Sequence, residues 1–209
     1  MSQTNESTIA EMFDRIAPRY DFLNSLLSMR QDRRWRTQLA SWLPPAYKGK
    51  ILDVACGTGD VLQTVFEKRK DFTNFVGVDI SKEMLKVADK KLEAIEGLRL
   101  EQQSAETLKF KNKEFDAVTI SFGLRNVQNK EKALEEFHRV LKKGGTLLVL
   151  EFFQSKTGLL SKLFRFYFHY ILPMIGSVFS DKKAYKYGIL GLVAALLFAW
   201  HIIKLGDGF

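Results

Sequence analysis

The feature that most constrains the fold is an apolar run that ends in a tight turn with two glycines. Residues 51–60 read Ile-Leu-Asp-Val-Ala-Cys-Gly-Thr-Gly-Asp, which places the glycines at Gly57 and Gly59. Glycine lets a strand turn directly into a helix and lets the backbone approach a ligand closely. A second apolar run starts at Phe75 and ends in a carboxylate, Asp79. A carboxylate at a strand tip accepts hydrogen bonds from ribose hydroxyls, so the two runs together favour an adenosine-type cofactor.

Strands and helices alternate along the middle of the chain. Residues 1–8 are polar and are expected to be frayed, and residues 9–43 have a helical pattern with a break near Pro18. Beyond them we expect strands over 50–54, 75–79, 98–102, 115–121 and 146–151, with helices over 60–70, 81–96, capped by Ser81, and 130–142. This alternation predicts an α/β fold with a doubly wound, mostly parallel sheet, in which ligands bind beyond the carboxyl ends of the strands. Polar side chains fall near those ends and favour a single crevice: Asp53, Asp79, Ser104, Ser121 and Glu151.

The turn departs from the dinucleotide pattern Gly-x-Gly-x-x-Gly at its third position, which is Leu62. The third glycine allows a helix to pack closely on a strand beside a pyrophosphate, so its absence disfavours NAD and FAD. Carboxylates at both ends of the turn, Asp53 and Asp60, would repel a phosphate but would attract a cationic amine or sulfonium. These residues favour S-adenosylmethionine, and the alternative is an ordinary strand–turn–helix that binds no ligand.

Composition narrows the class of protein. The 209 residues are enough for one domain with a core, and the single cysteine, Cys56, allows no internal disulfide. With that cysteine and three histidines the chain has no zinc-ligand spacing, so no metal site is predicted. The net charge of +8 is compatible with nucleic acid, anionic lipid or an acidic partner. For residues 1–150 we interpret it as general solubility, and we expect no nucleic-acid partner and no signal peptide.

Three segments resemble known methyltransferases. Residues 53–60 resemble the first motif of class I S-adenosylmethionine-dependent methyltransferases, which have a Rossmann-like fold. Residues 12–24, Met-Phe-Asp-Arg-Ile-Ala-Pro-Arg-Tyr-Asp-Phe-Leu-Asn, and 121–127, Ser-Phe-Gly-Leu-Arg-Asn-Val, resemble the menaquinone/ubiquinone C-methyltransferase family. The resemblance extends over about residues 9–187. It implies methyl transfer from S-adenosylmethionine to a ring carbon of demethylmenaquinol or of a polyprenyl-methoxybenzoquinol.

The resemblance also implies a set of cofactor-binding residues: Asp53, Gly57, Thr58, Gly59, Asp79, Ser104, Ala105 and Ser121. The Thr58 hydroxyl is expected to bond the methionine carboxylate, and Asp79 to bond the ribose. Ser104 stands where family members usually have Asp or Asn against the adenine amine, and its hydroxyl still accepts a hydrogen bond. For Thr58 the alternative is a simple turn residue, and for Ser121 it is a small side chain at a crowded strand end.

Three residues are candidates for catalysis: Arg125, Asn126 and Tyr20. Methylation at carbon requires a phenolate, which Arg125 would stabilise electrostatically while Asn126 orients the quinol or a bridging water. The alternative for Arg125 is an ion pair with a surface acid. Tyr20 is expected to be a lid residue or a proton relay, with a packing role as the alternative. His169 is a further candidate base.

The chain departs from the family pattern near Arg30, where a glycine is usual, and again at its end. After residue 187, family members continue with a helix and two more strands, whereas this chain has an uncharged run over 188–203. We therefore expect a five-stranded sheet with its final strands missing or replaced. The run is expected to be either a membrane-inserted helix or a helix that covers the sheet. Residues 159–172 are expected to admit a polyprenyl chain or to lie in the bilayer interface.

These observations divide the chain into a helical lid over 1–45, a cofactor-binding α/β core over 46–152 and an apolar region over 153–209 that faces the substrate or the membrane. Lysines and arginines flank the apolar runs and suit an anionic leaflet. The expected location is therefore cytoplasmic, peripheral to or anchored in the inner face of the membrane. The expected activity is methylation of a polyprenyl quinol. The alternatives are another small-molecule methyltransferase and an inactive, membrane-attached remnant that binds the cofactor.

Overall fold

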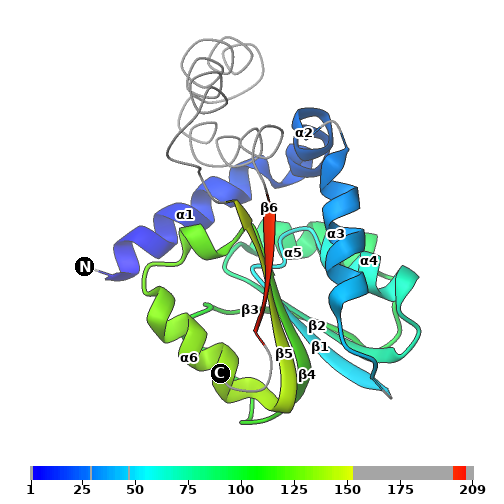
Figure 1. Ribbon diagram of the computed structural model, residues 1–209. Coiled ribbons are helices and arrows are strands. Elements are labelled where there is room, and N and C mark those ends of the chain that lie inside the picture. The colour runs from blue at the N-terminus through cyan, green and yellow to red at the C-terminus, as the bar shows by residue number, and fades with distance from the viewer. Residues whose placement is uncertain (1, 29, 47, 153–199, 206–209) are drawn as a thin grey trace, which may run out of the picture.

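The computed structural model describes residues 2–28, 30–46, 48–152 and 200–205, which form a sheet flanked by helices (Figure 1). Within these residues the sheet has six strands in the order β3-β2-β1-β4-β5-β6. Their bounds are β1 Gly49–Val54, β2 Phe72–Asp79, β3 Leu98–Gln102, β4 Phe115–Ser121, β5 Leu141–Phe152 and β6 Trp200–Leu205. The first five are parallel and β6 is antiparallel to β5. The predicted doubly wound, mostly parallel sheet is confirmed, and the order reverses between β1 and β4, where such folds bind ligands.

The helices follow the predicted alternation. Their bounds are α1 Ser2–Ile16, α2 Tyr20–Leu27, α3 Gln31–Trp42, α4 Asp60–Lys68, α5 Lys82–Lys91 and α6 Lys130–Val140, with short 3-10 helices η1 Ala17–Arg19 and η2 Leu124–Asn126. The predicted break near Pro18 is confirmed, because η1 separates α1 from α2. The expectation that residues 1–8 are frayed is wrong for residues 2–8, which belong to α1.

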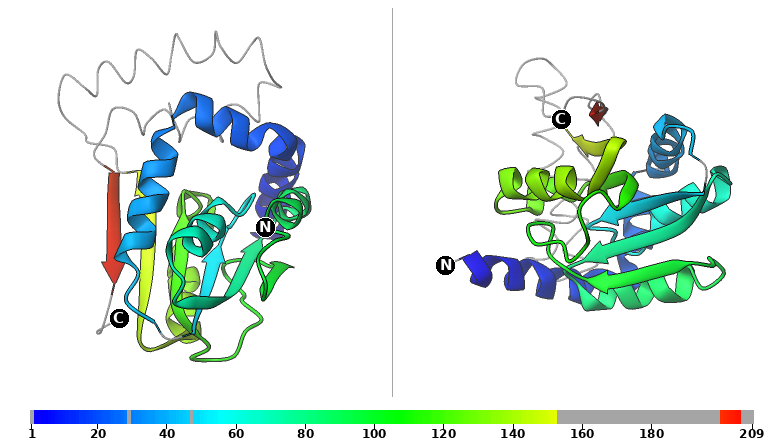
Figure 2. Two further views of the ribbon diagram at one scale, coloured as in Figure 1. Left: turned by 90° about the vertical axis from the view of Figure 1, so that its right-hand side faces the viewer. Right: turned by 90° about the horizontal axis from the view of Figure 1, so that it is seen from below.

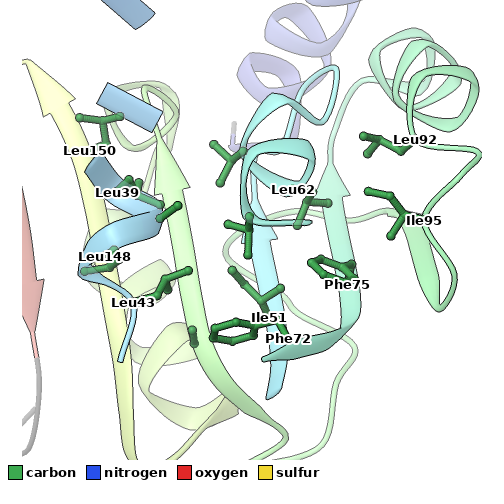
Figure 3. Close-up of a cluster of buried hydrophobic side chains, with 14 of the residues drawn as sticks. Leu39, Leu43, Ile51, Leu62, Phe72, Phe75, Leu92, Ile95, Leu148 and Leu150 are labelled. Atoms are coloured by element: carbon green, nitrogen blue, oxygen red, sulfur yellow. The ribbon is translucent and has the colours of Figure 1, made fainter. Parts of the chain in front are cut away.

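Two apolar clusters cover the two faces of the sheet because successive strand residues point to opposite sides. Ile51 joins the cluster formed with α3, α4 and α5, whereas its neighbour Leu52 joins the cluster formed with α6. Figure 3 shows the first cluster, in which Leu39 of α3 and Leu62 of α4 pack on the strands. Both of these leucines are fully buried. The sheet is therefore a rigid central layer that fixes the positions of the loops at its carboxyl edge.

A glycine on β2 compensates for the missing third glycine of the turn. A Cβ atom at Gly77 would lie 3.0 Å from Leu62 Cδ1, 2.8 Å from Leu100 Cδ2 and 2.9 Å from Cys56 Sγ. The side chain of Leu62 therefore packs where a side chain at Gly77 would be, and α4 comes close to the sheet without a glycine of its own. This packing explains how Leu62 is tolerated at that position of the motif.

The expected five-stranded sheet is wrong by one strand, because the structure describes a replacement strand at its edge. Residues 200–205 form β6, which pairs with β5 from Phe152↔Trp200 to Leu147↔Leu205 and so covers that edge of the sheet. The predicted helix over 188–203 is therefore wrong for residues 200–203, where two consecutive isoleucines favour a strand. Residues 188–199, the stretch 159–172 and His169 lie outside the described residues. Among the helices that the structure describes, none is long and apolar enough to cross a membrane.

The N-terminal helices arch over the carboxyl edge of the sheet (Figure 2, left). One end of the arch packs α1 against α5, and the other end packs α3 against α4. Arg69, just after α4, holds the α3 end of the arch in place. Its guanidinium donates to the carbonyl oxygens of Ala40, Leu43 and Pro44 at 2.7 to 2.9 Å. The arch places α2 and its first residue, Tyr20, above the strand ends.

Candidate active site

A pocket of about 720 Å³, including space open to solvent, lies at the carboxyl ends of the strands. It is lined by most of the predicted site residues: Tyr20, Gly57, Asp79, Ser104, Ala105, Ser121 and Asn126. The structure thus brings together residues from α2, from the glycine turn, from the ends of β2 and β4, and from the segments that follow β3 and β4. Four predicted residues are not part of this lining: Asp53, Thr58, Gly59 and Arg125.

Asp79 ties the tip of β2 to the glycine turn. Its Oδ2 accepts a hydrogen bond from the Gly57 amide at 2.8 Å, and its Oδ1 accepts one from the Ser81 amide at 2.8 Å. Burial raises the pKa of the Asp79 carboxyl, and these amide donors work against that rise. Each carboxylate oxygen retains a second lone pair, so Asp79 is able to accept from two ribose hydroxyls while it holds the turn.

Two buried oxygen atoms toward the carboxyl ends of β1 and β4 have no hydrogen-bond partner in the described structure: Asp53 Oδ2 and Ser121 Oγ, of which only Ser121 belongs to the pocket lining. The other carboxylate oxygen of Asp53 accepts from Thr119 Oγ1 at 2.6 Å. Burial raises the pKa of Asp53 to about 7. Buried polar atoms without partners are rare and mark places where a ligand completes the hydrogen bonding. A carboxylate and a hydroxyl suit an ammonium group, so these residues fit the amino-acid end of S-adenosylmethionine.

The backbone between β1 and β4 is shaped for close approach. Ala55 and Phe122, which follow these strands, have φ values of 53° and 56°, a region that residues other than glycine rarely adopt. A Cβ atom at Gly123 would lie 2.6 Å from the Ala55 Cβ. All three residues line the pocket, so this strained backbone forms one of its walls.

Arg125 is held by an acid on the neighbouring strand. Its Nη1 lies 2.6 Å from Glu151 Oε1, and its backbone amide donates to Glu151 Oε2 at 3.2 Å. Glu151 stands near the end of β5 and is buried. The predicted alternative, an ion pair, is therefore present, but with a buried acid rather than a surface acid. The adjacent Asn126 lies on the pocket lining, and the catalytic roles of both residues stay predictions.

Thr58 and Gly59 connect the glycine turn to α2 and to the end of α5. Thr58 Oγ1 donates to Asp21 Oδ1 of α2 at 2.5 Å and accepts from Lys91 Nζ of α5 at 3.1 Å. Gly59 has a φ of 83°, and a Cβ atom there would lie 2.4 Å from Leu92 Cδ1. The predicted bond from Thr58 to a methionine carboxylate would thus compete with Asp21 for the same hydroxyl hydrogen.

Tyr20 lies between the pocket and α1. Its ring packs edge-on against Phe13, with the ring centres 6.2 Å apart. Burial raises the pKa of the Tyr20 phenol. The side chain is therefore neutral at pH 7 and is a hydrogen-bond donor rather than a phenolate base.

Several lining residues were not predicted from the sequence. They are Glu6, Ile9 and Phe13 of α1, Met84 of α5, and Gln103, Glu106 and Gln128 in loops. The spacing of Ile9 and Phe13, four residues apart, places them on one face of a helix and signals a covered surface. Gln103 directly precedes the Ser104-Ala105 pair, so its proximity followed from the motif. Glu6 was missed because residues 1–8 were expected to be frayed.

Residues 1–191 match the ubiE/COQ5 methyltransferase family. The chain belongs to this family. The Ubiquinone/menaquinone biosynthesis C-methyltransferase UbiE of Geotalea uraniireducens is 45% identical over 182 residues, which cover 86% of this chain and 77% of that protein. The protein of the same name from Syntrophotalea carbinolica is 49% identical over 177 residues, which cover 84% and 74%. A Demethylmenaquinone methyltransferase of Lysinibacillus sphaericus is 38% identical over 186 residues, which cover 89% and 79%.

Solved structures support the fold of this family member. A putative methyltransferase from Bacillus halodurans is 27% identical with a TM-score of 0.53, covering 66% of this chain and 56% of its own. A SAM-dependent methyltransferase from Thermotoga maritima is 24% identical with a TM-score of 0.55, covering 75% and 67%. This ubiE/COQ5 family member is thus an S-adenosylmethionine-dependent methyltransferase with a Rossmann-like fold.

Proposed function

We propose that this protein methylates a ring carbon of a polyprenyl quinol in quinone biosynthesis, using S-adenosylmethionine. Demethylmenaquinol is the first choice of substrate, and a polyprenyl-methoxybenzoquinol is the second. The relatives named for ubiquinone/menaquinone biosynthesis and for demethylmenaquinone methylation support this substrate class. In this proposal residues 1–45 are the lid and 46–152 the cofactor-binding core, to whose sheet residues 200–205 add β6, while the rest of 153–209 faces the substrate or the membrane.

The cofactor site is assigned from the geometry of the strand ends. Asp79 binds the ribose while it holds the Gly57 amide, and Ser104 with Ala105 lies beside the adenine. The unpartnered oxygens of Asp53 and Ser121 receive the methionine ammonium. These two buried oxygens, beside a glycine turn that disfavours phosphate, are the observation that carries the proposal.

S-adenosylmethionine supplies an already activated methyl group, so the protein must align the acceptor and increase its electron density. Arg125 stabilises negative charge that develops on the ring oxygen, and Glu151 fixes the direction of its side chain. Asn126 orients the ring from the pocket lining. Tyr20 closes the pocket from above as a neutral phenol and excludes water. Alignment of two reactants is worth about 7–11 kcal/mol, so positioning supplies much of the acceleration.

The alternative of an inactive remnant rested on missing final strands. β6 argues against it, because this strand pairs with β5 from Leu147 to Phe152 and Glu151 lies in the paired segment. The strand that presents Glu151 to Arg125 is therefore not an exposed edge.

Calorimetric titration with S-adenosylhomocysteine tests the cofactor site, with the wild-type protein and the Asp79→Ala and Glu83→Gln variants. We expect Asp79→Ala to weaken binding by at least about tenfold, because the variant loses hydrogen bonds to a charged acceptor and frees the turn. Glu83 is an exposed residue of α5 that pairs with Lys86, and its variant should bind like the wild type. Equal affinity in Asp79→Ala and the wild type would exclude the assigned ribose contact.

The proposed location is the cytoplasmic face of the membrane, where a polyprenyl substrate resides. The support for it comes from the basic residues that flank the apolar runs within 153–209. Co-sedimentation with vesicles tests it: binding to anionic vesicles that weakens with salt is expected. Absence of binding to both anionic and neutral vesicles would contradict it.

A further inference from the structure

A chain of charged groups connects the N-terminal arch to the cofactor turn. Asp21, in the first turn of α2, accepts from Thr58 Oγ1 at 2.5 Å and forms an ion pair with Lys91 of α5. The same Lys91 Nζ donates to Thr58 Oγ1 at 3.1 Å and to Asp60 Oδ1 at 2.8 Å. One ammonium group therefore contacts α2, the glycine turn and the start of α4 at once.

The chain of charges continues into α3. Asp60 Oδ2 lies 3.0 Å from Arg36 Nη1, and Arg36 Nη2 lies 2.5 Å from Asp32 Oδ2. Burial would raise the pKa of Asp60, but Arg36 and Lys91 outweigh it and lower that pKa. Asp60 is therefore ionised at neutral pH and holds a cation on each side. The α2–α3 half of the arch is thus fixed to the turn by opposite charges rather than by apolar packing alone.

These charged contacts lie next to residues that line the pocket. Tyr20, which lines the pocket, is the residue directly before Asp21. Thr58 lies between Gly57 and Gly59, so the Asp21–Thr58 bond restrains the turn that Asp79 holds from its other side. On α3, the Trp35 ring packs edge-on against the pocket residue Phe122, with the ring centres 6.0 Å apart. A movement of the arch would therefore displace two walls of the pocket together.

We propose that Asp21 and Lys91 are positioning residues that clamp Tyr20 and the Gly57–Gly59 turn together over the bound cofactor. The identity of that cofactor rests on the proposed function. Asp21 and Lys91 act through Tyr20 and Thr58 and do not line the pocket themselves. The clamp governs how long the cofactor stays bound, so its loss raises the dissociation rate and the KM for S-adenosylmethionine more than it lowers kcat.

The expected change in the dissociation rate follows from how deeply the contacting side chains are buried. Thr58 is 2% exposed, so Asp21→Asn, which replaces the carboxylate with a neutral amide, weakens the hydrogen bond of a buried hydroxyl and removes the charge that attracts Lys91. The Lys91 and Asp21 side chains are 20% and 39% exposed, so water screens part of their attraction. A hydrogen bond to a charged group that is partly screened corresponds to about tenfold in an equilibrium or a rate.

Trp35 provides the signal for a direct test. The Trp42→Phe and Trp200→Phe substitutions leave it as the sole tryptophan of the chain, 4% exposed and in contact with the pocket wall. Stopped-flow fluorescence then measures the dissociation rate of S-adenosylhomocysteine in this background. The variants are Asp21→Asn, Lys91→Gln and the double variant. The matched control is Lys86→Gln, which removes an exposed ion pair with Glu83 on the same helix.

We expect each single variant to raise the dissociation rate about tenfold and the double variant to add little, because both residues belong to one contact. Lys86→Gln should stay within about twofold, as expected for an exposed pair. Single-variant rates like that of the control, or a double effect equal to the product of the single effects, would overturn the clamp. If Asp21→Asn does not fold, Lys91→Gln still decides. A wild type that does not bind S-adenosylhomocysteine would instead refute the proposed function.

Discussion

Asp53 offers a prediction that links stability to cofactor binding. Burial raises the pKa of its carboxyl from 3.8 to about 7. A pKa difference of this size corresponds to on the order of 4 kcal/mol between the two protonation states. Because the folded pKa is the higher one, its stabilising contribution is complete below about pH 4 and is lost as the pH rises through about 7. Asp53→Asn removes this titration, so its unfolding free energy should depend less steeply on pH between 5 and 7.

Cofactor affinity should also depend on the protonation of Asp53. It should rise with pH, whereas the stability of the fold falls. An ammonium group beside Asp53 Oδ2 favours the ionised acid, so binding lowers the pKa of Asp53 and releases a proton. Affinity for S-adenosylhomocysteine should therefore fall by up to about tenfold for each pH unit below 7. In Asp53→Asn the affinity should be weaker at pH 7.5 and nearly constant with pH.

Two measurements check both statements. Urea unfolding at pH 5, 6, 7 and 8 gives the stability of the wild type and Asp53→Asn, and their difference isolates Asp53 from Asp79, whose pKa is also raised by burial. Calorimetry in buffers of different ionisation enthalpy counts the protons released on binding. Parallel stability curves for the two proteins, or wild-type affinity that is constant from pH 5.5 to 7.5, would refute the reasoning.

Three further predictions concern other parts of the site and its supports. Arg125→Ala should lower kcat by at least about a hundredfold, since it removes an electrostatic stabiliser, while calorimetry shows cofactor affinity unchanged; full turnover would contradict its assigned role. Arg30 has a φ of 63°, so Arg30→Gly should relieve backbone strain and stabilise the fold by about 0.5–1 kcal/mol, seen as a higher Tm; a lower Tm would argue against strain there. Gly123→Ala should destabilise the fold by about 1–3 kcal/mol, because its Cβ would lie 2.6 Å from the Ala55 Cβ. Urea unfolding measures this change, and a variant as stable as the wild type would contradict the predicted clash.

The core of the fold was predictable because its signals are local. Apolar runs that end in glycine or a carboxylate located β1 and β2, and Ser81 was expected to cap the following helix. The structure confirms that cap, since Ser81 Oγ accepts from the Met84 amide at 3.1 Å. Arg30 adopts the left-handed conformation that glycine favours, which fits the expectation that a glycine is usual near this position.

The C-terminal run was misread for a physical reason. An uncharged segment that is almost entirely apolar has no period, so it does not distinguish a buried strand from an apolar helix. What decides the matter for residues 200–205 is the open edge of β5, which offers backbone hydrogen bonds to an antiparallel partner. That edge exists only in the folded sheet, and the isoleucine pair at 202–203 is too short a local sign to predict the strand.

Side-chain partners across the site were equally hidden from the sequence. Thr58 was predicted from the motif, but Asp21, 37 positions away along the chain, uses its hydroxyl. The acid paired with Arg125 is Glu151, 26 positions away, and its burial depends on strand pairing. Sequence patterns identify residues that gather at one end of a sheet, whereas the direction of each side chain depends on long-range packing.

An assay of methyl transfer to demethylmenaquinol tests the proposed activity itself. The purified protein in mild detergent is incubated with isotopically labelled S-adenosylmethionine and the quinol, and the product is analysed by mass spectrometry. We expect a labelled methyl group on the ring carbon, and its loss in Asp79→Ala and Arg125→Ala. A folded protein that binds S-adenosylhomocysteine but methylates neither demethylmenaquinol nor a polyprenyl-methoxybenzoquinol would contradict it.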